Sequence, residues 1–211
     1  LFNDSDLLVF ASTHKSGAGV PSLTVHAPGN FTDEALLGGN PSELAMASAR
    51  ASKCGLLFLL RQENRVPGYE AAQEATHHGP TSLKAPVVFA EVGSTEKEWA
   101  NETAGAKVAE CIMHVCANWK KEPLEKAAIG FGGPHYLDKF SGLIKERGWG
   151  FTHVASRHTA AKMKPGMAAQ AVQKSLEAVD IAVVEKKSFN AQQRKTVLDE
   201  ISKAGLDAEI I

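Results

Sequence analysis

The sequence of 211 residues has no long apolar run and few cysteines. Its longest apolar run, GLLFLL at 55–60, ends at Arg61, whereas a membrane-spanning helix needs roughly 20 apolar residues. Cys54, Cys111 and Cys116 are odd in number and lack C-x-x-C spacing, which argues against a disulfide framework and a cysteine zinc site. We therefore expect a cytoplasmic protein without a membrane segment, in which the three thiols pack as inert apolar groups.

Charge is also nearly balanced, with a formal net charge of −1, but it is divided unevenly along the chain. Residues 1–105 hold 7 Lys and Arg against 12 Asp and Glu, and residues 106–211 hold 16 against 12. Two interpretations remain open: ordinary solvated helix faces, or a basic surface in the later half that contacts phosphates. Lys162 and Lys164 are the candidates for such contacts.

Segments with the pattern of strands alternate with segments that have the pattern of helices. Strands are expected at 6–12, 69–78, 85–94, within 126–136, and at 180–186 and 206–211. Helices are expected from a capping box at Asn40 to about Asn64, from Thr95 to Trp119, and at 137–148, 166–179 and 190–205. A long loop is expected between the first strand and Asn40. The alternation predicts one α/β domain with a layered, mostly parallel sheet.

Histidines are concentrated where the predicted strands end. The candidates are His14, His26, His77, His78 and His135, accompanied by Glu74 and Glu91. Sites in sheets of this class form at the carboxyl ends of strands, so we expect these side chains to converge. Imidazoles and carboxylates suit Zn²⁺, which lowers the pKa of bound water to about 7 and so favours hydrolysis. The alternative is that they are hydrogen-bonded structural residues, since no H-E-x-x-H spacing is present.

Other polar groups near these segments have two interpretations each. Gly132 and Gly133 either cradle an anion or permit a tight bend that presents His135, and the bend is favoured. Ser12 and Thr13 either satisfy loop backbone groups or donate to a substrate oxygen. Three further histidines are expected outside the site or are ambiguous: His114 is assigned to packing or surface, His153 to a structural role, and His158 to neither role.

Four segments in the same order carry a family resemblance: STHKSGAGVPSLTVHAPGN, EATHHGPT, FAEVGSTEKEW and GFGGPHY. They closely resemble the signature segments of the archaeal- and plant-type D-aminoacyl-tRNA deacylases. The resemblance implies an enzyme that hydrolyses the ester of D-aminoacyl-tRNA to free D-amino acid and tRNA, with two zinc ions per chain. It also implies a three-layer, phosphorylase/hydrolase-like α/β sandwich similar to peptidyl-tRNA hydrolase. We expect residues 1–211 to form a single monomeric catalytic domain that lacks an amino-terminal strand and helix usual in the family.

The resulting hypothesis gives each candidate residue a role. Metal ligation is assigned to His14, His26, His77 and His135, and catalysis to His78, Glu91, Glu74 and His14, with one of the two glutamates as general base. Substrate contacts are assigned to Ser12, Thr13, Gly132, Gly133, Lys162 and Lys164. Three alternatives remain open: a metal-free mechanism with a histidine base, a zinc-dependent peptidase or amidohydrolase, and an aminoacyl-tRNA binding protein without turnover.

Overall fold

A computed structural model describes residues 4–17 and 19–211. Residues 1–3 and 18, which fall within the predicted domain and the predicted loop, lie outside the described residues. The strands are β1 (Leu8–Lys15), β2 (Ser22–His26), β3 (Glu70–Gln73), β4 (Val87–Ser94), β5 (Ala127–Phe131), β6 (Gly150–Ala155), β7 (Ile181–Val184) and β8 (Ala208–Ile210).

The α-helices alternate with these strands over most of the chain. They are α1 (Ala49–Gln62), α2 (Glu96–Trp99), α3 (Glu102–Asn118), α4 (Asp138–Arg147), α5 (Arg157–Ala160), α6 (Met167–Gln173) and α7 (Ala191–Lys203). Short 3₁₀ turns are η1 (Glu63–Arg65), η2 (Trp119–Lys121) and η3 (Lys186–Ser188). Within the described part of the chain, no helix combines the length and the apolar character needed to cross a membrane.

The strands form two four-stranded sheets, with the orders β1-β4-β2-β3 and β6-β5-β7-β8. All neighbouring strands are parallel except β2 and β4, which run antiparallel. The two sheets meet just beyond the end of β3, beside β6. There the Thr76 amide donates to the Val154 carbonyl at 2.9 Å. The expected α/β fold with a mixed, mostly parallel arrangement is confirmed, although the hydrogen bonding divides it into two sheets.

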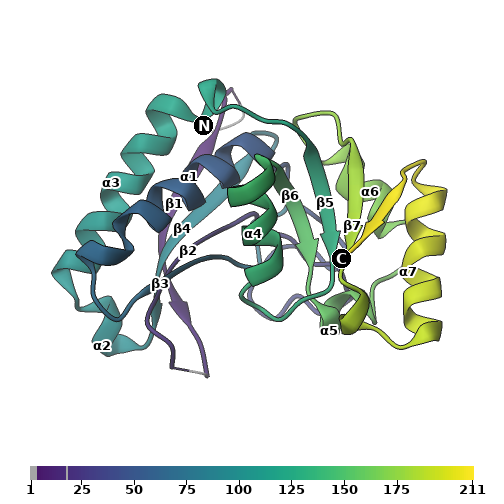
Figure 1. Ribbon diagram of the computed structural model, residues 1–211, viewed down its shortest axis with the longest axis horizontal. Coiled ribbons are helices and arrows are strands. Elements are labelled where there is room, and N and C mark those ends of the chain that lie inside the picture. Colours follow the sequence, from purple (N-terminus) through teal and green to yellow (C-terminus); the bar gives the residue numbers. More distant parts are fainter. Residues whose placement is uncertain (1–3, 18) are drawn as a thin grey trace.

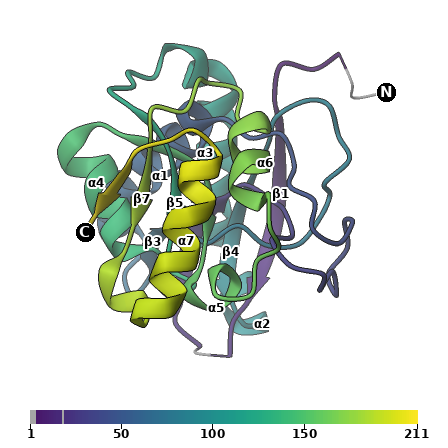
Figure 2. The ribbon, with the colours of Figure 1, turned by 90° about the vertical axis from the view of Figure 1, so that its right-hand side faces the viewer.

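Helices cover both faces of the second sheet. Successive side chains of a strand point to opposite faces. On β7, Val183 therefore joins the apolar core beneath α1 and α4, while Ala182 and Val184 join the core with α6 and α7. Figures 1 and 2 show the corresponding layers, with α1 and α4 on one side of the strands and α6 and α7 on the other.

Among the described residues, helices cover one face of the first sheet and not the other. Leu23 and Val25 of β2, with Val92 of β4, belong to the core that α1 and α3 cover. The alternating residues Thr24 and Glu91 point to the opposite face and are nevertheless buried. Loop segments cover this face in place of helices. Two of them are joined where the Gly29 amide donates to the His78 carbonyl at 2.7 Å. This face, buried and polar, is where the candidate site lies.

Two strands lie where none was predicted. β2 falls inside the predicted loop, because its five residues lie between Pro21 and Pro28 and include Ser22 and Thr24, which resemble loop composition. β6 was also missed, because its sequence GFTHVA is short and interrupted by polar residues. Only residues 70–73 of the predicted strand at 69–78 pair as a strand.

The predicted start of the first long helix is wrong. α1 begins at Ala49, with the Ser48 side chain accepting from the Ala51 amide at 3.1 Å. Asn40 and Glu43 do bond to each other at 2.8 Å, but in a loop. The helix predicted at 95–119 is divided between α2 and α3, and the helix predicted at 166–179 ends at Gln173.

Glu177 caps the N-terminus of α1, although it lies far from this helix in the sequence. Its carboxylate accepts from the Ser48 hydroxyl at 2.7 Å and from the Ala49 amide at 2.8 Å. Because a carboxylate is stabilising at a helix N-terminus, Glu177→Ala is expected to lower the free energy of unfolding by about 1–2 kcal/mol. Urea denaturation measures this, with Glu146→Ala, an exposed position on α4, as the control. Equal unfolding midpoints for the two variants would contradict the assignment.

Candidate functional site

The pairing of β1, β4 and β2 places three site residues on the buried polar face. In the register, Glu91 of β4 lies beside Ser12 of β1 and Thr24 of β2. His14 and His26 follow two residues after Ser12 and Thr24, so both point to the same face as Glu91. Two imidazoles therefore flank the Glu91 carboxylate from neighbouring strands.

His77 and His78 enter the same site from the segment after β3. On a regular strand they would point to opposite faces, but His78 has a φ of 47°, in the left-handed region. Both rings consequently lie together, with their centroids 4.4 Å apart. The expectation that both histidines turn to one side is confirmed, although β3 ends earlier than predicted, at Gln73.

His135 reaches the site after a bend at two glycines. Gly132 and Gly133 have φ values of 113° and 79°, which glycine adopts readily. A Cβ on Gly132 would lie 2.9 Å from Cβ of Glu185, so the bend also has no room for a side chain. The bend brings His135 over the end of β3, where its carbonyl accepts from the Ala75 amide at 2.8 Å.

Two buried carboxylates hold the five imidazoles together. Glu74 Oε2 lies 3.1 Å from His135 Nε2, 3.4 Å from His14 Nδ1 and 3.7 Å from His77 Nε2. Glu91 lies 3.7 Å from His14 Nδ1, 3.8 Å from His26 Nε2 and 4.0 Å from His78 Nε2. All seven residues predicted at the site therefore converge in one cluster.

Backbone carbonyls orient three of the imidazoles. Nδ1 of His26, His77 and His78 lies 3.3, 2.8 and 2.6 Å from the carbonyl oxygens of Ala27, Ala75 and Gly79, respectively. A carbonyl oxygen only accepts, so each Nδ1 carries the hydrogen. In the neutral tautomer, the lone pair on each Nε2 then faces the carboxylates, as in histidines that bind metals.

The electrostatics favour an ionised Glu74 beside imidazoles of which three have a lowered pKa. Burial would raise the pKa of Glu74, but the hydrogen bond from His135 and the nearby imidazoles outweigh it and hold that pKa at about 2. Burial lowers the pKa of His14, His77 and His78, most strongly that of His77. His26 is the exception: burial lowers its pKa, but Glu91 and Glu74 raise it by more.

The residues present fit a metal ion. Side-chain donors within 4.8 Å of one another form three groups: His14, Glu74, His77 and His135; His26, His77 and His78; and His26, Glu74 and Glu91. Within the described residues, Glu74 Oε1 and His26 Nε2 are buried without a hydrogen-bond partner. Buried polar atoms normally have one, and a nitrogen and oxygen donor set of this kind suits Zn²⁺.

A pocket of about 570 Å³ opens onto this cluster. Ser12 and Thr13 line it, as expected for residues that contact a substrate, and so does Glu91, whereas Glu74 lies deeper. Lys15 and Phe89 also line it, and no sequence signal marks either residue beyond its position next to strand-end site residues.

Two of the expected substrate contacts are not available. The Gly132 amide donates to the Ala155 carbonyl at 2.8 Å and the Gly133 amide to Ser188 Oγ at 2.7 Å, so neither is free for an oxyanion. This corrects the anion-binding interpretation and leaves the tight bend.

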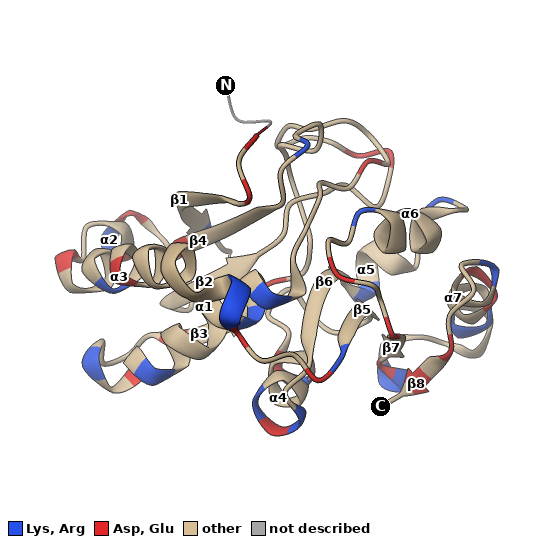
Figure 3. Cartoon of the chain, turned by 90° about the horizontal axis from the view of Figure 1, so that it is seen from above, with Lys and Arg blue, Asp and Glu red and all other residues tan. Residues whose placement is uncertain are grey.

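Lys164 forms an ion pair with Asp33, and neither Lys162 nor Lys164 lines the pocket beside the cluster. Figure 3 shows lysines and arginines on several helices of both halves, not on one element.

The remaining histidines and the cysteines lie outside the site, and one cysteine differs from its prediction. His114 bonds to Asn118 on α3, and His158 is exposed beside Arg157. Cys54 and Cys111 are buried, and burial raises the pKa of each thiol to about 12, so both are inert. Cys116 is exposed, so the expectation that it packs in the interior is wrong, because it faces away from the core side of α3.

His153 is fully buried, and its Nε2–H donates to the Ala45 carbonyl at 3.0 Å. Burial lowers its pKa from 6.5 to about 4, so the unfolded chain binds a proton that the folded chain does not between these values. The contribution of neutral His153 to the free energy of unfolding is fully present above about pH 6.5. It decreases as the pH is lowered, by about 2 kcal/mol from pH 7 to pH 5. His153→Gln is expected to remove this part of the slope in urea denaturation of metal-free protein. An identical slope in both proteins would contradict it.

Comparisons with known proteins agree with this geometry. Residues 1–209 match the family model described as D-aminoacyl-tRNA deacylase. Proteins named D-aminoacyl-tRNA deacylase from Methanosarcina acetivorans, Pyrococcus furiosus and Methanocaldococcus jannaschii are 38%, 36% and 32% identical over 96%, 96% and 97% of this chain. The matched part spans 66%, 72% and 82% of their lengths, which is just under two thirds of the first.

A solved structure has the same fold. The crystal structure of a conserved protein of unknown function superimposes with a TM-score of 0.88 at 30% sequence identity, over 99% of this chain and 72% of that one. The match with the family model extends over nearly the whole sequence and includes all seven residues of the cluster. The chain therefore belongs to the D-aminoacyl-tRNA deacylase family.

Proposed function

We propose that residues 1–211 act as a catalytic unit that hydrolyses the ester of D-aminoacyl-tRNA, releasing free D-amino acid and tRNA. The observation that supports hydrolysis is the convergence of five imidazoles and two carboxylates beside a pocket of about 570 Å³. The substrate class comes from the family and from the names of the relatives.

The cluster suits Zn²⁺, and we assign a first ion to His14, Glu74, His77 and His135. The resemblance implies a second ion, for which His26 and His78 are the remaining imidazoles. Since Nδ1 of His77 carries a hydrogen, its single lone pair serves one ion at a time. When bound, zinc supplies a water of pKa about 7 and polarises a carbonyl oxygen.

The protein residues have separate tasks in this proposal. Glu74 is buried beneath the imidazoles and does not line the pocket, so we assign it to the first ion as a ligand and not to proton transfer. Glu91 lines the pocket and is the group that takes a proton from the attacking water. Ser12, whose side chain lies on the same face of β1 as His14, is placed to donate to the developing oxyanion, and Thr13 lines the same pocket beside it.

Hydrolysis of D-tyrosyl-tRNA, compared with L-tyrosyl-tRNA, tests the proposal. We expect turnover of the D ester that disappears when zinc is removed by a chelator and returns when zinc is added. Zinc content is measured on the same samples. Cleavage of a peptide without ester turnover would favour the peptidase alternative, and binding of both esters without turnover would favour the binding-protein alternative.

His78→Ala separates the metal mechanism from a metal-free mechanism. His78 lines the pocket, and its Nε2 lies 4.0 Å from Glu91. We expect the variant to lose activity by about 100-fold, as when a catalytic proton-transfer or metal-binding group is removed. Loss of part of the zinc identifies His78 as a ligand, whereas full zinc content with the same loss identifies it as the base in place of Glu91.

A further inference from the structure

Two pockets meet at His77 and His78, which line both of them together with Leu37. The larger has a volume of about 570 Å³ and the smaller about 180 Å³. Pockets for whole drug-sized ligands measure roughly 300–1,000 Å³, so the smaller one holds only a small group. An aminoacyl ester joins two unlike groups at one reacting carbon, and two spaces that share a wall of imidazoles suit such a molecule.

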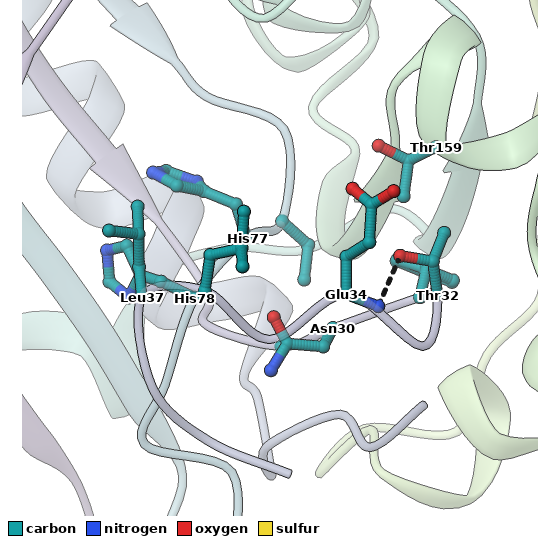
Figure 4. Close-up of a pocket in the computed structure, with 11 residues that line it drawn as sticks. Asn30, Thr32, Glu34, Leu37, His77, His78 and Thr159 are labelled. Carbon is teal, nitrogen blue, oxygen red and sulfur yellow. Dashed lines mark hydrogen bonds between the residues drawn. The ribbon is translucent and has the colours of Figure 1, made fainter. Parts of the chain in front are cut away.

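The smaller pocket carries an uncompensated negative charge. Figure 4 shows Glu34 on the side of this pocket away from His77 and His78, with Thr32 and Thr159. The Glu34 amide donates to Thr32 Oγ1 at 3.2 Å, but its carboxylate forms no hydrogen bond or ion pair with residues 4–17 or 19–211. A cationic group in the pocket would therefore find an acceptor that the protein itself does not use.

Asp33, the neighbouring carboxylate, shows the contrast. It accepts from Ser42 Oγ at 2.9 Å and forms an ion pair with Lys164, so its charge is compensated within the chain. Asp33 does not line the smaller pocket, whereas Glu34 does. The two residues therefore provide a matched pair in which only Glu34 is available to a ligand.

The larger pocket has a cationic group in its wall in addition to the Glu91 carboxylate of the cluster. Lys15, at the end of β1, lines it and forms no ion pair in the described part of the chain. The Phe89 ring lies in the wall, with its centroid 4.7 Å from that of His78 and 5.2 Å from that of His26. The ring is buried and stacks on Phe10 as well as His26, so it contributes apolar wall and not a free face for a nucleobase. Lysines attract phosphates, so Lys15 suits the phosphate end of a nucleotide.

We propose that the aminoacyl group enters the smaller pocket, where the Glu34 carboxylate pairs with its α-ammonium group, and that the 3′-terminal nucleoside occupies the larger pocket with its phosphate toward Lys15. This inference rests on the proposed function and gives the direction in which the substrate lies. The reverse orientation would bring phosphates toward Glu34 and the ammonium group toward Lys15. Charge therefore selects the direction.

Binding of a stable analogue tests the assignment without requiring turnover. The probe is an RNA minihelix that carries D-tyrosine through an amide bond at its 3′-terminal ribose, with either a free or an acetylated α-amino group. At pH 7, Glu34→Gln is expected to raise the Kd of the free-amino form by about three- to fivefold, the size of one exposed ion pair. The Kd of the acetylated form stays unchanged. Asp33→Asn is expected to change the Kd of neither form.

Salt dependence tests the other half of the assignment. Lys15→Ala is expected to reduce the slope of log Kd against log salt by about one for both forms of the probe. Lys195→Ala, which removes an α7 lysine paired with Asp199, leaves the slope unchanged. Equal effects of Glu34→Gln on the two forms, no effect on either, or no binding of the probe would overturn the inference. Failure of the proposed function is recognised separately, as an ester that is not hydrolysed although the amide analogue binds with the expected dependence on Glu34.

Discussion

Glu74→Gln is expected to lower kcat/KM for D-tyrosyl-tRNA by about 1,000-fold and to remove zinc from the first group of ligands. The substitution keeps the shape of the side chain but removes the charge that faces His14, His77 and His135 at 3.1–3.7 Å. An amide offers one weak oxygen donor in place of a carboxylate, and its NH₂ group has to face three imidazoles. Metal analysis of the purified variant, together with single-turnover deacylation, measures both effects.

Glu70→Gln is the matched control, because Glu70 is the exposed first residue of β3, the strand that leads directly to Glu74. It should leave activity and zinc content unchanged. Circular dichroism establishes whether Glu74→Gln still folds, since losing a buried carboxylate also affects stability. A folded variant that keeps its zinc and its activity would show that Glu74 is not the centre of the site.

Glu91→Gln is expected to lower kcat/KM by about 100-fold or more while the first zinc ion is retained. Glu91 lines the pocket but does not belong to the group formed by His14, Glu74, His77 and His135. Glutamine preserves the shape of the side chain and an oxygen facing His26 and His78, but has no lone pair basic enough to take a proton from water. Loss of activity with retained metal is therefore the expected signature of the general base.

Glu96→Gln, at an exposed position at the start of α2, serves as the control for this variant. A Glu91→Gln protein that loses both zinc and activity would identify Glu91 as a ligand. Full activity would exclude it from both roles.

The sequence predicted best those elements whose local signals agree with their packing. α7 was expected at 190–205 and is found at Ala191–Lys203, with the Asn190 and Gln193 side chains forming a capping box. β4 was expected at 85–94 and is found at Val87–Ser94, as a continuous buried run. In contrast, β2 has ordinary loop composition, and its identity depends on pairing with β3 and β4, which sequence patterns do not reveal.

The membership of the cluster was also visible in the sequence, because strands bring their ends together. Its geometry was not. The left-handed conformation of His78 turns two adjacent histidines to one side, and the burial of Glu74 beneath the imidazoles depends on the bend that carries His135. Glu34 was missed because nothing in a loop sequence distinguishes it from Asp33, whose charge is used by Lys164.

The contact between Glu177 and the start of α1 has a consequence for how the chain can be divided. A cut between η2 and β5 would leave α1 and most of the cluster in one fragment, and Glu177 and His135 in the other. The first fragment would lack the cap of its long helix, and each would lack donors for the first zinc ion. Association of the two fragments would therefore restore the metal site. A split reporter requires a site of this kind, which forms only when both fragments are together.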